Sequence, residues 1–196
     1  VLDPDSQPVI PEEDFFALLK KRKGVLEGVV ITGGEPTLNR DLPDFIRRIK
    51  AEGYLVKLDT NGTSPAMVEG MLKEGLLDYI AMDIKNTREK YAPTAGISPD
   101  SPLLSRLEET KNLIINSGID HEFRTTVIAE HHTVEDLIAM GETVRGAKVY
   151  YLQPFRDYDT LVGAKTGELH APSKEFLITA KQRLEGIVKT EIRGLE

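Results

Sequence analysis

The residues of this sequence that are best suited to chemistry stand directly after short apolar runs. They are Glu35 behind the pair Gly33-Gly34, the tetrapeptide Asp59-Thr60-Asn61-Gly62, Asp83 with Lys85, the pair His131-His132, and Gln153 with Arg156. Glycine has no Cβ, so a ligand can approach the backbone of Gly33-Gly34 closely. Taken singly, the glycine pair and Asp59 are also typical of ordinary tight turns.

Asp83 and Lys85 are two positions apart, so in a strand both side chains point to the same face. Two opposite charges on the inner face of a sheet are costly unless they pair with each other or bind a ligand. The spacing favours ligand binding over a simple ion pair. A desolvated lysine at the end of a barrel strand can also form a Schiff base, which gives an aldolase hypothesis for Lys85.

Arg124 and the histidines offer weaker signals. Arg124 lies in an apolar strand pattern and, if it points inward, belongs either to a structural ion pair or to a ligand site. Adjacent histidines project in different directions, so we expect His131 and His132 on a solvated loop rather than at a metal. His121 and His170 have no supporting neighbours and are expected at the surface.

Hydrophobic periodicity divides the chain into alternating helices and strands. Helices are expected at 12–22, 41–53, 64–75, 102–118, 133–144 and 176–184, and strands at 28–32, 54–59, 78–84, 122–128, 147–152 and 188–192. The nearly all-apolar run 28–32 predicts a strand buried on both faces. Thr133-x-x-Asp136 predicts a capping box. Residues 86–101, without periodicity, are expected to form a long functional loop.

This alternation predicts parallel strands joined by helical crossovers, in one domain over residues 1–196. An open doubly wound sheet would gather its polar residues at one switch point, whereas here they follow nearly every strand. In a parallel barrel such strand ends converge on one mouth, where sites are built. We therefore predict a partial (β/α)6 TIM-like barrel.

Composition limits the possible partners. The 196 residues include 25 basic and 32 acidic side chains, a net charge of −7, so nucleic acid is not an expected partner. No segment is apolar and long enough to suggest a membrane span, and a cytoplasmic location is expected. The chain has no cysteine, begins with Val1, and shows no strand before its first helix. We therefore expect an N-terminally truncated piece of a longer protein.

Four motifs in order resemble the radical S-adenosylmethionine enzymes. They are Ile-Thr-Gly-Gly-Glu-Pro at 31–36, Leu-Asp-Thr-Asn-Gly at 58–62, Met-Asp-Ile-Lys at 82–85 and Leu-Gln-Pro-Phe at 152–155. Within that superfamily the chain looks most similar to the glycyl-radical activating enzymes, in particular those of anaerobic ribonucleotide reductase and pyruvate formate-lyase. The resemblance implies cofactors S-adenosylmethionine and a 4Fe-4S cluster, which together yield a 5′-deoxyadenosyl radical that takes a hydrogen from a glycine of a partner protein.

The resemblance also implies roles for particular residues. Gly33, Gly34 and Glu35 would meet the methionine amino group, and Lys85 would bind its carboxylate. Asp59, Thr60, Asp83 and Arg124 would surround the methionine end, with a possible cation between Asp59 and Asp83. Residues 86–101 would contact the glycyl-radical protein, and flavodoxin or ferredoxin would supply the electron.

The chain departs from the family in two respects. The family's Cys-x3-Cys-x2-Cys loop after the first barrel strand is absent, so no thiolate can bind cluster iron, and the fragment itself is expected to be inactive with no catalytic residue of its own. Arg156 stands where the pyruvate formate-lyase branch has a histidine. Besides the aldolase hypothesis, a non-catalytic nucleoside-binding barrel stays open.

Overall fold

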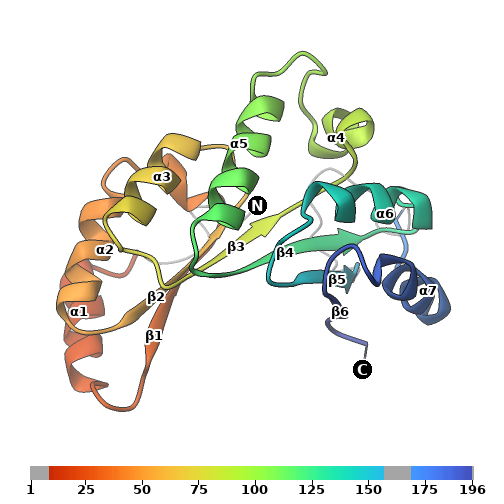
Figure 1. Ribbon diagram of the computed structural model, residues 1–196. Coiled ribbons are helices and arrows are strands. Elements are labelled where there is room, and N and C mark those ends of the chain that lie inside the picture. Colours follow the sequence, from red (N-terminus) through yellow and green to blue (C-terminus); the bar gives the residue numbers. More distant parts are fainter. Residues whose placement is uncertain (1–8, 157–168, 196) are drawn as a thin grey trace.

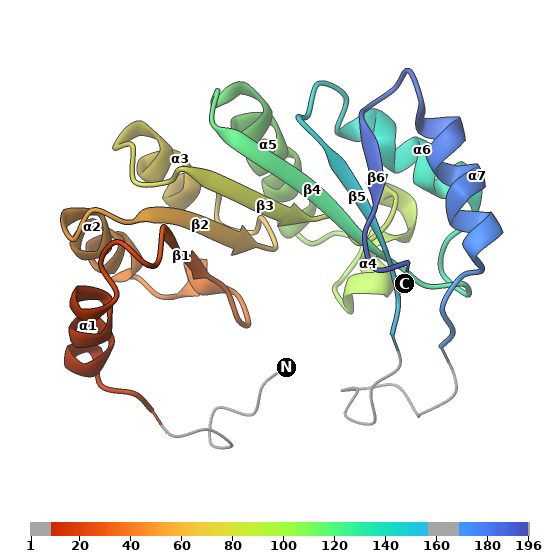
Figure 2. The ribbon, with the colours of Figure 1, turned by 90° about the horizontal axis from the view of Figure 1, so that it is seen from below.

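The computed structural model describes residues 9–156 and 169–195, and its centre is one parallel six-stranded sheet (Figure 1). The strands lie side by side in chain order: β1 (Gly28–Ile31), β2 (Leu55–Thr60), β3 (Tyr79–Asp83), β4 (Asp120–Val127), β5 (Tyr150–Pro154) and β6 (Thr190–Ile192). The sheet curves into an arc without joining β1 to β6 (Figure 2). The predicted partial parallel barrel is therefore confirmed, as an open one.

Helices cover the convex side of the arc (Figure 2). They are α1 (Glu12–Lys21), α2 (Leu42–Ala51), α3 (Pro65–Lys73), α5 (Leu103–Asn116), α6 (Val134–Thr143) and α7 (Lys174–Leu184). The core lies between helices and sheet, where Ile46, Leu58, Met82 and Phe123 are fully buried. Within the described ranges no helix is long and apolar enough to cross a membrane. The predicted capping box of α6 is present.

The prediction that residues 28–32 are buried on both faces is wrong. β1 is the edge strand of the described sheet and pairs only with β2, through the register Gly28↔Leu55 to Ile31↔Leu58. Val30 is 55% exposed, because it lies on the concave face at this open edge. Val29 and Ile31, on the other face, are only partly buried, so this strand departs from the usual burial of parallel strands on both faces.

The expected loop at 86–101 contains a helix, α4 (Arg88–Ala95). Its sequence has no regular apolar stripe and includes Pro93, so hydrophobic periodicity could not reveal it. Contacts with other segments hold it in place. Lys90 Nζ lies 2.6 Å from Asp136 Oδ2 at the start of α6, and Asn86 Nδ2 donates to Thr94 Oγ1 at 3.0 Å.

Candidate ligand site at the carboxyl ends of the strands

The concave face of the sheet carries charged side chains at alternate strand positions. In β2 the buried Val56, Leu58 and Thr60 face the helices, which leaves Lys57 and Asp59 on the concave side. The same alternation in β4 turns Phe123 and Thr125 to the core and Glu122 and Arg124 to the concave face. Strand register then places charges from β2, β3 and β4 side by side.

Arg124 links two of the predicted site residues. Its Nε donates to Asp83 Oδ1 at 2.7 Å and its Nη1 donates to Asp59 Oδ2 at 3.0 Å. Burial alone would lower the pKa of Arg124, but the neighbouring Asp83 and Asp59 outweigh it and raise that pKa. The guanidinium thus spans the gap between the two carboxylates. Among the described residues, no group of three or more His, Asp or Glu is arranged to hold a metal ion.

Glu122 was not predicted from the sequence, yet it is the most deeply buried carboxylate of this face, at 2% exposure. Arg193 donates to both of its oxygens at 3.2 and 3.0 Å, and the Tyr79 hydroxyl donates at 2.9 Å. Lys57 Nζ lies 3.5 Å from Glu122 and 3.5 Å from Asp59 Oδ1. The period-two pairs Lys57-x-Asp59 and Glu122-x-Arg124 were the signal available in the sequence.

Glu35 ties the end of β1 to the end of β2. Its Oε1 accepts from the Thr37 amide at 3.1 Å and from Thr60 Oγ1 at 2.8 Å, while its Oε2 accepts from the Asn61 amide at 2.5 Å. Glu35 therefore fixes the turn, and the glycines before it stay accessible. Gly33 and Gly34 have φ of +95° and +53°, and no atom lies within 4 Å of where a Cβ would stand.

A cavity of about 220 Å³ lies at the carboxyl ends of β3 and β4. Asp83 and the exposed Lys85 line it from the β3 side, and Thr126, Ile128 and His131 line it from the β4 side. Lys85 does not pair with Asp83, whose carboxylate is bound to Arg124 instead. The cavity thus offers an ammonium, a carboxylate edge and an imidazole at the mouth of the barrel.

Two histidine predictions are wrong. His132 is 3% exposed, because its ring bridges the backbone after β3 and the backbone after β4. His121 is 2% exposed, with Nδ1 2.9 Å from Ile119 O and Nε2 accepting from the Lys148 amide at 3.2 Å. His170 is exposed as predicted and pairs with Glu130 at 2.6 Å, and the hydrogen bonds of His170 lower the pKa of Glu130 to about 2.

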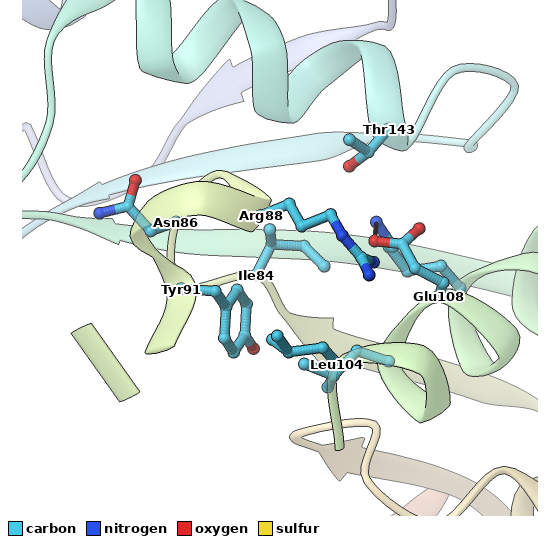
Figure 3. A pocket seen from close by; sticks show the side chains of 9 residues that line it. Ile84, Asn86, Arg88, Tyr91, Leu104, Glu108 and Thr143 are labelled. Carbon is cyan, nitrogen blue, oxygen red and sulfur yellow. Dashed lines mark hydrogen bonds and ion pairs between the residues drawn. The ribbon is translucent and has the colours of Figure 1, made fainter. Parts of the chain in front are cut away.

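A much smaller cavity, about 20 Å³, lies on the helix side of the β3 exit between α4 and α5 (Figure 3). Arg88 and Glu108 reach toward each other across it, while the Tyr91 ring of α4 lies against it. Lys111 is buried there and pairs with Glu108 at 2.8 Å. Burial raises the pKa of Tyr91. The side chains around this cavity hold α4 beside the ligand cavity. The cavity itself has room for little more than a water molecule.

The comparisons with known proteins fit this geometry. A family model described as the radical SAM superfamily matches residues 4–144. The chain belongs to this superfamily. A relative from Methanocaldococcus jannaschii, whose name assigns it to the glycyl-radical enzyme activating enzymes, is 32% identical over 183 residues, covering 86% of this chain and 72% of the relative. A Pyrococcus abyssi protein named a GTP 3′,8-cyclase is 31% identical, over 76% of this chain and 51% of the relative.

Solved structures agree on the fold of this radical SAM chain. A domain of the pyruvate-formate lyase-activating enzyme from Bacteroides vulgatus superposes with a TM-score of 0.67 at 18% identity, covering 85% of this chain and 99% of that domain. Streptococcus suis SuiB, solved with S-adenosylmethionine bound, gives 0.68 at 16% identity, covering 96% of this chain and 44% of that protein. At these identities the likeness shows the fold alone.

The two cofactors of the superfamily fit these residues differently. Asp59 Oδ1 is buried and accepts no hydrogen bond from the described residues, with Lys57 Nζ 3.5 Å away. The glycine backbone of the turn after β1 is open, and Lys85 lines the cavity at the ends of β3 and β4. An acceptor, an approachable backbone and a cation suit the amino and carboxylate groups of S-adenosylmethionine. A 4Fe-4S cluster needs thiolates, and this sequence contains no cysteine, so the residues of this sequence do not fit a cluster.

Proposed function

We propose that this chain is the S-adenosylmethionine-binding barrel of a glycyl-radical activating enzyme. Sequence coverage supports the assignment, because the M. jannaschii relative matches 86% of this chain and 72% of its own length. The matches to the cyclase relatives from Metallosphaera sedula and Pyrococcus abyssi cover only 28% and 51% of the length of those proteins. Relatives named as activating enzymes and relatives named as cyclases both match this chain. The assignment therefore depends on which match covers more of the relative's own length.

The proposed cofactor position is the cavity at the ends of β3 and β4 together with the open turn of β1. Lys85 there binds the methionine carboxylate as a point charge, which a flexible ammonium does well. Gly33 and Gly34 offer their backbone to the amino group. Asp59, Asp83 and Arg124 form the wall between these two contacts, while Thr60, which faces the helices, donates to Glu35 and helps it to fix the turn. The single observation that carries the proposal is the cavity lined by both Asp83 and Lys85.

In the parent protein, bound S-adenosylmethionine would supply the radical chemistry, and the chain's own residues would bind and orient the cofactor. The partner is a glycyl-radical protein such as anaerobic ribonucleotide reductase, contacted by residues 86–101, where α4 flanks the cavity. A flavodoxin or ferredoxin serves as electron donor. The aldolase alternative gains nothing from the geometry, since a Schiff-base lysine requires a water-excluded pocket and Lys85 is exposed.

The test begins with the gene that encodes this chain. We expect a Cys-x3-Cys-x2-Cys segment to be encoded upstream of Val1, and we expect the complete protein to place a glycyl radical, seen by electron paramagnetic resonance, on its partner. The K85M variant of the complete protein should bind S-adenosylmethionine at least about tenfold more weakly. Formation of 5′-deoxyadenosine without a glycyl radical on any candidate partner would point to another radical SAM reaction. Binding of the cofactor without iron, and no radical, would favour the nucleoside-binding barrel.

A further inference from the structure

We infer that His132 is a positioning residue that holds Lys85 at the ligand cavity. The His132 ring is buried between the two strand exits, with Nε2 2.9 Å from Lys85 O and Nδ1 3.1 Å from the Ile128 amide nitrogen. A carbonyl oxygen can only accept, so the ring donates to Lys85 O through Nε2, while Nδ1 faces the backbone of Ile128, with the amide nitrogen at 3.1 Å and the carbonyl oxygen at 3.2 Å. One imidazole ring thus joins the backbone after β3 to the backbone after β4.

The location of this bridge gives it a role beyond packing. The β3–β4 ladder continues one step past the end of β3, where the Ile84 amide donates to Arg124 O at 2.8 Å. His132 then supplies the next connection between the two strands, at Lys85. Lys85, Ile128 and His132 itself all line the 220 Å³ cavity. Because the Lys85 side chain itself is exposed, the fixed backbone beneath it determines the region that its ammonium can reach.

His121 makes the same kind of bridge at the opposite end of β4. It is as deeply buried as His132 and joins Ile119 O to the Lys148 amide. Neither Ile119 nor Lys148 lines the cavity at the carboxyl ends of the strands. A role in stability alone would make the two histidines equivalent, whereas the inferred role makes only His132 matter for the ligand.

The inference rests on the proposed binding of S-adenosylmethionine and is tested by calorimetric titration of the chain with that compound. An asparagine amide reaches only as far as the imidazole Nδ1, whereas a glutamine amide reaches as far as Nε2. We expect H132N to weaken binding about threefold to tenfold, and H132Q to restore it. H121N should cost similar stability and leave binding within about twofold of the wild type. Equal losses of affinity in H132N and H121N would overturn the inference.

A double-mutant cycle separates this inference from the proposed function. If His132 acts through Lys85, H132N in a K85M background should cost no further affinity. The proposed role of Lys85 would be overturned if K85M bound S-adenosylmethionine as tightly as the wild type does. It would also be overturned if the wild type did not bind S-adenosylmethionine. A clear K85M effect with fully additive H132N would overturn only the role of His132. If H132N does not fold, the wild-type His132 Nε2–H signal in nuclear magnetic resonance replaces it: S-adenosylmethionine should shift that signal, and an unmoved signal contradicts the inference.

Discussion

Asp83 and Arg124 are direct partners in the register of β3 and β4, and their side chains form an ion pair with Arg124 Nε 2.7 Å from Asp83 Oδ1. The same guanidinium reaches across to Asp59 on β2 at 3.0 Å. A planar fork with several donors can hold two carboxylates at once, which an ammonium does less well. Three adjacent strands are thereby tied together at the mouth of the proposed ligand site.

Replacing Arg124 by methionine should leave Asp59 and Asp83 without their shared partner. Because the pair is only partly exposed, we expect R124M to lower the free energy of unfolding by about 2 kcal/mol at pH 7. Urea denaturation measures this difference. The matched control is R145M, whose exposed pair with Glu142 on α6 should cost less than about 0.5 kcal/mol. Equal costs for the two variants would show that the bridge adds nothing to stability.

The buried Glu122 predicts a pH-dependent stability. Burial raises the pKa of Glu122, but the hydrogen bonds from Arg193 and Tyr79 and the charge of Lys57 outweigh burial, and the net pKa is lowered below its ordinary value of 4.5. A carboxyl with a lowered folded-state pKa stabilises the fold fully above its unfolded pKa and loses that contribution as pH falls through the folded value.

We therefore expect E122Q to be less stable than the wild type by about 1–3 kcal/mol at pH 7. The difference should narrow steadily as pH falls below 4.5, where the wild-type carboxyl becomes protonated. Urea titrations of both proteins between pH 7 and pH 3 measure it. A constant difference over this range would mean that Glu122 stabilises by shape rather than by charge.

The sequence predicted the strands and the barrel well because parallel strands appear in it as short, nearly continuous apolar runs. The predicted 54–59 and the observed Leu55–Thr60 differ by one residue at each end, and Asp59 and Asp83, both singled out from their motifs, share Arg124 as a partner. Side chains two positions apart in a strand point to the same face of the sheet. Spacing alone therefore predicted which neighbours share a face with Asp83.

Long-range contacts were beyond such reasoning. The burial of His132 depends on Lys85 O, 47 residues away, and the burial of Glu122 depends on Arg193, 71 residues away. Helix α4 has no apolar period, and its place is set by Lys90 and Asp136. Each of these features exists only once distant strands are already side by side, so local pattern could not indicate it.

The attachment of α4 to α6 should be removable without unfolding the protein. Lys90 is about half exposed, so K90M should change the free energy of unfolding by less than about 1 kcal/mol. Local opening of α4 should nevertheless become easier, because this ion pair joins it to the core of the domain. Hydrogen exchange should accelerate in residues 88–95 while β3 and β4 keep their protection. Unchanged exchange in α4 would assign its anchoring to Tyr91 instead.

Two glycines with positive φ should respond differently to alanine. At Gly62, with φ +80°, an added Cβ would overlap the end of the Met82 side chain, so G62A should cost about 2–4 kcal/mol of stability. At Gly34 the space is open, and G34A should cost only about 1 kcal/mol of backbone strain.

The affinity of G34A for S-adenosylmethionine distinguishes a lost ligand contact at Gly34 from backbone strain alone. If S-adenosylmethionine approaches the Gly34 backbone, the new methyl group should weaken its binding by more than about tenfold, beyond anything expected from the change in stability. Gly118, with φ +80° and equally open space before β4, provides the control, since G118A brings comparable strain far from the strand exits. Calorimetric titration of both variants with S-adenosylmethionine decides the matter. Equal affinity in G34A and G118A would remove the glycine turn from the proposed binding site.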